Sequence, residues 1–272
     1  MRSDDFLTQE VLGHGGYLCA RAVDGRDLRG AGAHAIPSLA ARLRLRNEFD
    51  PADTAPGGTI AFLGRCAATT GEIEDGEVLQ AQLVIHVSSG RAEVVDESLG
   101  EISRRLSAAG PVRTLRGSAR SRNYTGAAMQ RWAYDRAVVQ QPGAVAPNAF
   151  LLPLSKTGEW WGKGWMERHT YFLPTYDARG AMTSEGHALA AAAGIECLLR
   201  RTYRAATEPA PEGEYDFLTY FECSDGDVPV FLRVREALRD VARNPEWRFV
   251  REGPTWHGRR APSWDALFSG CA

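Results

Sequence analysis

One order of elements occurs twice in this chain of 272 residues. In residues 79–119, alternating apolar residues precede a Ser-Ser-Gly turn, a helical stripe, Gly110-Pro111 and a second apolar run. In residues 215–251, the same order consists of Tyr215–Cys223, a Ser-Asp-Gly turn, a helical stripe, Asn244-Pro245 and a final apolar run. Sequence identity between the two units is low, so only the pattern repeats. Mixed units of this kind predict an α+β fold in which two ferredoxin-like repeats form a dimeric α+β barrel.

The first unit shows both periodicities clearly. Val78–Val87 alternates apolar residues with glutamines and His86, which predicts a strand with one buried face and places His86 in contact with solvent. The helical stripe that follows has apolar residues at spacings of four, three and four and ends before Gly110-Pro111, as expected for an amphipathic helix. The residues of the stripe are Val95, Leu99, Ile102 and Leu106.

Three other stretches carry local signals. Gly13–Gly16 lacks the Lys-Ser/Thr ending of a phosphate-binding loop, so we interpret it as a glycine turn before a strand. Pro174–Ala193 is predicted to be helical, with Pro174 in its first turn and Gly194 at its end. Trp247–Arg251 is expected to form the last strand.

A turn-rich segment, Pro142–Pro147, is the expected hinge between the two repeats. It predicts an N-terminal ferredoxin-like half over residues 1–145, divergent and with an N-terminal extension, and a C-terminal ferredoxin-like half over residues 146–272. The residues that carry recognisable chemistry lie in the second half.

The composition excludes several classes of protein. With 32 basic and 34 acidic residues, the near-neutral charge gives no basis for binding nucleic acid or a membrane surface. No apolar run of the length of a membrane span and no secretion signal is present, so we expect a cytoplasmic protein. The five cysteines are scattered, which argues against structural zinc, covalent haem attachment and a disulfide framework.

Four motifs of the second half occur in an order that resembles a known family. They are Lys156–Trp161, which reads Lys-Thr-Gly-Glu-Trp-Trp; a histidine and an arginine thirteen residues apart, His187 and Arg200; the run Arg200–Tyr203; and the strand Asp216–Glu222. Together they resemble the chlorite dismutases and the related coproheme decarboxylases. The resemblance covers about residues 146–260, and the first half matches only in its order of elements.

This resemblance implies a haem b cofactor, with His187 as the axial ligand of the iron. It further implies Glu246 as the carboxylate that accepts a hydrogen bond from His187, and Arg200 as the cation over the open face of the haem. In the chlorite dismutases, chlorite is converted to chloride and dioxygen. The implied partners are a small-molecule substrate (chlorite, a peroxide or a small organic molecule) and copies of the chain in a homo-oligomer, a dimer or a pentamer.

The residue types suit these roles chemically. An imidazole that binds iron is neutral and keeps one nitrogen for the metal, while the other donates to an acceptor such as Glu246. The Arg200 guanidinium is permanently charged and offers several donors to an anionic oxidant. Each residue also has an ordinary alternative, a core histidine or a strand arginine in an ion pair. His169 competes with His187, but Met182 stands where His169 would require an arginine.

The other candidates are less specific. Trp160 and Trp161 either line the haem edge or pack in the core. Lys156 pairs with a haem propionate or is solvated. Tyr171 is the possible radical site implied by the coproheme decarboxylases, whose Tyr-x-Leu-Pro segment Tyr171–Pro174 resembles.

One departure from the family leaves the substrate open. Trp161 and His187 are twenty-six residues apart, so additional residues stand around Gly162–His169. Four functions are compatible with the sequence: chlorite dismutation, peroxide-dependent coproheme decarboxylation through Tyr171, oxidation of a small organic substrate in a specialised pathway, and haem binding or protein interaction without catalysis.

Overall fold

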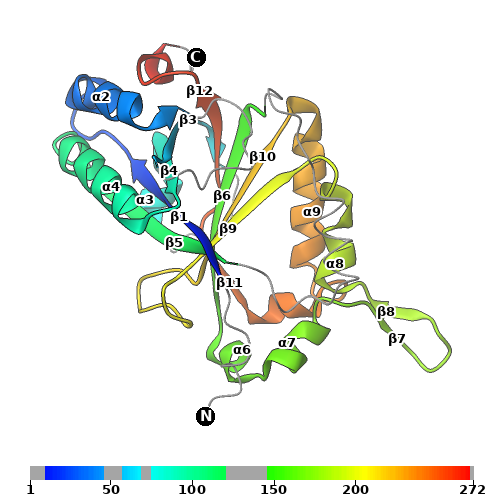
Figure 1. The fold of residues 1–272 in the computed structure, drawn as a ribbon. Coiled ribbons are helices and arrows are strands. Elements are labelled where there is room, and N and C mark those ends of the chain that lie inside the picture. Colours follow the sequence, from blue (N-terminus) through cyan, green and yellow to red (C-terminus); the bar gives the residue numbers. More distant parts are fainter. Residues whose placement is uncertain (1–9, 46–56, 69–74, 121–145, 270–272) are drawn as a thin grey trace.

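Eight strands form a closed ring of hydrogen bonds in the computed structural model, which describes residues 10–45, 57–68, 75–120 and 146–269 (Figure 1). Two further strands, β2 (Arg44–Leu45) and β11 (Val250–Glu252), pair with single members of the ring. In the order of pairing, the ring consists of β10 (Phe217–Cys223), β9 (Leu199–Arg204), β5 (Val112–Arg120), β1 (Val11–Ala20), β4 (Leu83–Ser89), β3 (Thr59–Ala68), β12 (Trp256–Ala261) and β6 (Asn148–Lys156), which pairs with β10 again.

The ring consists of two units with the same topology. Each unit has the chain order β-α-β-β-α-β, and its strands are arranged as β5-β1-β4-β3 in the first and β12-β6-β10-β9 in the second. This is the ferredoxin-like arrangement, so the predicted α+β class and its repeat are confirmed. The units join where β3 pairs with β12 and where β5 meets β9 through one residue pair, Ser118 and Arg204. The predicted boundary between residues 145 and 146 stays a prediction, because residues 121–145 lie outside the described part.

Helices cover the ring on two sides (Figure 1). The helices α1 (Leu28–Gly32), α2 (Ala35–Arg42) and α4 (Ala92–Leu106) share one apolar cluster with the outer face of β1, β3 and β4. On the other side, α9 (Val228–Arg239) packs on Phe150 and Leu152 of β6. A third cluster, which includes Tyr17, Leu151 and Trp256, fills the inside of the ring. Strand β4 is therefore buried on both faces along its whole length, and β1 and β6 are buried along most of theirs.

Two errors of the sequence interpretation lie around His86, and double burial explains the second of them. The strand β4 begins only at Leu83, because Gly76–Leu79 forms a short helix, α3, which Asp75 caps by accepting hydrogen bonds from two backbone amides. His86 points into the ring and not to solvent: it is 1% exposed. Its Nε2 lies 2.9 Å from the Tyr203 hydroxyl, and its ring stacks on Tyr17.

The predicted turn at Gly13–Gly16 is wrong, because all four residues belong to β1. A Cβ atom on Gly15 would lie 2.1 Å from Cζ of Tyr203, and one on Gly16 would lie 2.6 Å from the Leu115 carbonyl oxygen. Glycine is used here for close approach between neighbouring strands and not for a turn.

Most of the predicted helix Pro174–Ala193 is also wrong. A hairpin of β7 (Thr175–Tyr176) and β8 (Met182–Ser184) occupies its first part, because Asp177 accepts hydrogen bonds from two turn amides and Gly180 adopts a φ of 80°. Only α8 (Gly186–Ala190) remains helical before a 3₁₀ turn at Ala192–Gly194.

The elements near the C-terminal end of the described residues also differ from the prediction. Trp247–Arg251 is mainly a 3₁₀ helix, Pro245–Phe249, followed by β11, and β12 was not predicted. The predicted helix with the apolar stripe from Val95 to Leu106 is confirmed as α4, and the apolar run that follows Gly110-Pro111 is confirmed as β5. In the described part of the chain, no helix combines the length and apolar character needed to cross a lipid bilayer.

Two glycine substitutions should have opposite effects. Gly15→Ala should lower the free energy of unfolding by about 1–3 kcal/mol, because its methyl group meets the buried Tyr203 ring. Gly100→Ala in α4 should raise it by about 0.5–1 kcal/mol, because a Cβ there meets no atom within 4 Å and alanine favours the helix. Urea unfolding of both variants measures the difference, and equal effects would contradict the close packing at Gly15.

Candidate functional site

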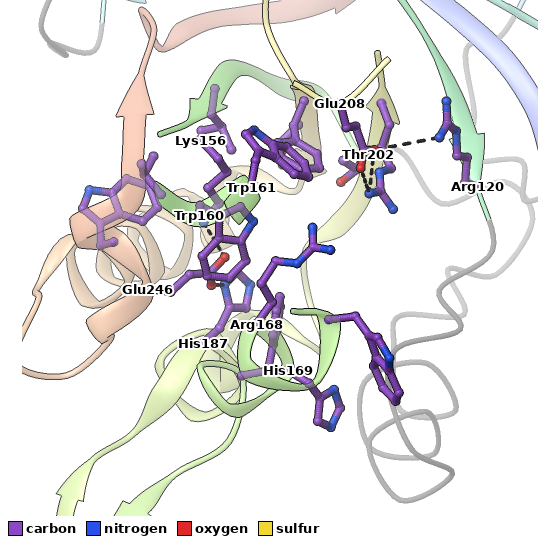
Figure 2. A pocket seen from close by; sticks show the side chains of 18 of the residues that line it. Arg120, Lys156, Trp160, Trp161, Arg168, His169, His187, Thr202, Glu208 and Glu246 are labelled. Carbon is purple, nitrogen blue, oxygen red and sulfur yellow. Dashed lines mark hydrogen bonds and ion pairs between the residues drawn. The ribbon is translucent and has the colours of Figure 1, made fainter. Parts of the chain in front are cut away.

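A pocket opens between β9 and β10 on one side and a group of short helices on the other (Figure 2). The helices are α6 (Gly158–Gly162), α7 (Trp165–Thr170) and α8, with the 3₁₀ helix Pro245–Phe249 beside them. Figure 2 shows Trp160, His187 and Glu246 on one side of the pocket and Thr202, Glu208 and Arg120 on the other. Five of the sequence-predicted site residues line it besides Glu246: Lys156, Trp160, Trp161, His187 and Arg200.

A chain of three charged or titratable groups forms one wall. The Glu246 carboxylate accepts a hydrogen bond from Lys156 Nζ at 2.5 Å through Oε1 and contacts His187 Nδ1 at 2.8 Å through Oε2. The side chains of Lys156 and Glu246 are each 6% exposed. His187 Nε2 makes no hydrogen bond to any residue that the structure describes, so it is the nitrogen left for a ligand.

The charges of this chain follow from its environment. Burial lowers the pKa of His187 below 6.5, and although Glu246 opposes this shift, the charges of Arg200 and Lys156 add to it. Burial alone would raise the pKa of Glu246, but Lys156 and His187 outweigh it and hold the value at about 2. Near neutral pH the site therefore contains a carboxylate and a neutral imidazole whose Nδ1 carries the proton that Glu246 accepts.

The backbone before His187 is fixed at several points. Gly186 adopts a φ of 64°, and a Cβ there would lie 2.4 Å from the Leu173 carbonyl oxygen. The amides of Gly186 and His187 donate to the carbonyls of Arg243 and Tyr171 at 3.0 and 3.1 Å. Two backbone segments therefore fix the position of His187: residues 171–173, and the residues from Arg243 that lead to Glu246.

Strand β9 supplies the facing wall. Arg200, Thr202 and Arg204 alternate along it and all line the pocket. Sequence reasoning identified Arg200 alone, although the period of two places the next two even-numbered residues on the same face. Arg204 is paired with Glu208 through Nη2, which lies 2.6 Å from Oε2. Arg120 donates to the Ala205 carbonyl at 2.8 Å, and nothing in its own sequence context indicated a place in the pocket.

The two adjacent tryptophans both reach the pocket, whereas Tyr171 does not line it. Thr157 caps α6 and accepts from the Trp160 amide. Lys156 Nζ lies 4.2 Å from the centroid of the Trp160 ring, and Trp161 Nε1 donates to the buried Asp216. Tyr171 packs behind Trp160, with ring centroids 5.6 Å apart. The roles predicted for Tyr171 as a radical site and for Lys156 as a propionate partner stay predictions.

The additional residues around Gly162–His169 form part of the pocket wall. Trp165, Arg168 and His169 of α7 all line it. His169, the competitor of His187, has no carboxylate partner in the described part of the chain, so His187 has the better support for a metal ligand.

The site suits a metal that is held mainly by a macrocycle. The described residues contain no cluster of three or more histidine, cysteine, aspartate or glutamate side chains that could hold a metal ion alone. They offer one neutral imidazole, fixed by a carboxylate, beside flat apolar walls that include Trp160, Trp161 and Phe217. This donor set fits haem, whose porphyrin supplies the other iron ligands.

The Lys156–Glu246 pair should behave as one unit in stability measurements. Lys156→Met or Glu246→Gln alone should each cost about 3–5 kcal/mol, because a buried charge loses its partner. The double variant should lose clearly less than the sum of the two. Denaturant unfolding of the four proteins gives the coupling energy, and additive losses would contradict the pairing.

The Glu246 carboxylate should make the free energy of unfolding depend on pH. Since the folded-state pKa of Glu246 is about 2 against an ordinary 4.5, its contribution to stability is complete above pH 4.5 and is lost as the pH falls towards 2. Glu246→Gln should therefore give a shallower loss of stability than the wild type between these values. Unfolding free energies measured from pH 5 downwards test this, and parallel curves would contradict it.

No protein-family model matches the sequence, and no curated protein matches it either. Solved structures do match. A mutant chlorite dismutase from Candidatus Nitrospira defluvii in complex with cyanide aligns with a TM-score of 0.65 and 17% identity, covering 99% of both chains. A chlorite dismutase from the same organism in complex with imidazole gives 0.65 and 16%, covering 98% of both chains. This chain therefore has the fold of the chlorite dismutases along almost its whole length.

Proposed function

We propose that this chain is a haem b-dependent oxidoreductase that uses chlorite or a peroxide-type oxidant. The observation that carries the proposal is the neutral His187 imidazole, whose Nδ1 contacts Glu246 and whose Nε2 is left for a ligand in an aromatic pocket. The likeness of fold to chlorite dismutases supports it, although a fold alone does not determine a reaction. Two of the similar structures contain cyanide or imidazole, both common ligands of metal ions.

In this proposal His187 would hold the haem iron through Nε2, and the haem would supply the redox chemistry. Glu246 keeps the Nδ1 proton directed at itself and makes the imidazole a stronger electron donor. Lys156 holds the Glu246 carboxylate in its charged form, since both are buried and bonded to each other. Glu246 and Lys156 are thus positioning residues, whereas His187 touches the cofactor.

Arg200 binds the anionic oxidant. It lines the same pocket as His187, and its charge is close enough to help lower the histidine's pKa. A guanidinium retains its charge at any relevant pH and holds an oxyanion through several donors. With chlorite, both oxygen atoms leave as dioxygen and chlorine leaves as chloride, so no further reactant is needed. Arg200 would hold the chlorite anion in the pocket during this conversion.

Oxidation of a small organic substrate is the second candidate. The observation that favours it is the contribution of α7, from the additional residues 162–169, to the pocket wall. Coproheme decarboxylation through Tyr171 has less support, because Tyr171 lies behind Trp160 and does not line the pocket.

As part of the proposal, the chain acts as a homo-oligomer.

His187 should be essential for ligation. The wild type should take up haemin and give a Soret band, while His187→Ala should bind haemin at least tenfold more weakly with a shifted band, since the axial bond is lost. Added imidazole should restore the original band position. Visible spectra recorded during haemin titration test this, with His34→Ala, far from the pocket in sequence and structure, as the matched control. Equal spectra for both variants would refute the ligand role.

Arg200 should be needed for chlorite conversion and not for haem binding. Arg200→Ala should lower oxygen evolution from chlorite by about 10²–10³-fold, because a preorganised donor to a developing anion is removed. Haemin uptake should remain near the wild-type value. A Clark electrode measures the oxygen. If the haem-loaded wild type evolves none, the organic-substrate candidate replaces the chlorite reaction.

A further inference from the structure

The helix α7 brings a cation into the pocket that the proposed function does not use. Its residue Arg168 lines the same pocket as His187 (Figure 2). The guanidinium lies against Trp161, with Cζ 5.5 Å from the ring centroid. The Nε atom of Arg168 is buried and has no hydrogen-bond partner in the described part of the chain. A buried donor without an acceptor carries a cost that a bound ligand removes.

The carboxylates around the pocket are engaged elsewhere. Glu246 is held by Lys156 and His187, and Glu208 by Arg204. The two acidic residues nearest to Arg168 on α6 and α7, Glu159 and Glu167, both pair with Lys163, at 3.6 and 2.8 Å. Within the described residues, Arg168 therefore brings a positive charge into the pocket without a protein carboxylate to neutralise it.

We propose that Arg168 is the binding residue for a carboxylate group of a ligand in this pocket. The planar guanidinium fork matches a carboxylate in a bidentate geometry. The guanidinium lies within cation–π distance of Trp161, and the indole rings of Trp160 and Trp165, which also line the pocket, suit an attached flat organic body. The carboxylate is either that of a propionate side chain of haem or that of a separate organic acid. The inference rests on the proposed haem function only for the first source.

Haemin and its dimethyl ester distinguish a haem propionate from a separate organic acid as the source of the carboxylate. The full-length protein is titrated with haemin and with haemin dimethyl ester, in which both propionates are uncharged, and tryptophan quenching gives each Kd. If Arg168 binds a propionate, Arg168→Gln weakens haemin binding by about tenfold or more and leaves the ester unchanged. Arg168→Lys should recover part of the loss, because it keeps the charge without the fork. The matched control is Arg179→Gln, an exposed arginine in the turn of the β7–β8 hairpin.

Benzoate tests the second source. If Arg168 binds an organic acid, Arg168→Gln leaves haemin binding unchanged but weakens benzoate binding to the haem-loaded protein by about tenfold, measured by calorimetry. Benzamide, which has the same ring but no charge, should not distinguish the variants. Arg168→Gln proteins that bind haemin and benzoate as the wild type does would overturn the proposal.

If the proposed haem function is wrong, the same titrations give a different result. A wild type that takes up neither haemin nor its ester refutes the proposed function, and benzoate titration of the haem-free protein then decides the role of Arg168. Weaker benzoate binding in Arg168→Gln supports the carboxylate site, and unchanged binding overturns it. Circular dichroism of each variant shows that the fold is retained, so a loss of binding is not a loss of folding.

Discussion

The Glu246 carboxylate is the group on which the candidate site depends. It accepts from Lys156 at the end of β6 and contacts His187 at the start of α8, so one buried anion joins three segments that are far apart in the sequence. An anion without these partners would be costly in the interior. Its presence therefore requires Lys156 to be charged and Nδ1 of His187 to carry a proton. The tautomer of the candidate metal ligand follows from the electrostatics of its neighbour.

The barrel supplies this interaction with a rigid support. The inner faces of β6 and β10 pack in the cluster around Tyr220. Their outer faces pack on α9 in one part and line the pocket in another. Trp160 is the one large apolar side chain that the short helices α6, α7 and α8 bury. They are held by caps and backbone contacts such as those of Gly186 and Thr157. One half of the pocket is thus β-structure, and the other half, which carries Trp160, Arg168 and His187, is built from short helical turns.

The sequence predicted those features that depend on local periodicity or on motif order. The α+β repeat and the helix α4 follow from the spacing of apolar residues, and the placement of His187, Glu246 and Arg200 in one pocket agrees with the motifs. Two of the errors have the same physical cause, which is double burial. His86 and Gly13–Gly16 look polar or flexible in isolation, yet they lie where strands press against one another inside a ring. Arg168 and Arg120 could not be assigned, because only the tertiary fold brings them to the pocket.

The number of paired residues differs between neighbouring strands of the ring. Seven residue pairs connect β10 to β6, whereas in the described residues β5 and β9 share only the pair Ser118 and Arg204. That narrow junction lies at the pocket, since Arg204 and Arg120 from its two strands both line the cavity. The Arg120 side chain adds hydrogen bonds to the carbonyl groups of Ala205 and Ala206 across the same junction. This part of the pocket wall is therefore joined mainly by side chains, whereas the other described seams of the barrel are joined by backbone ladders.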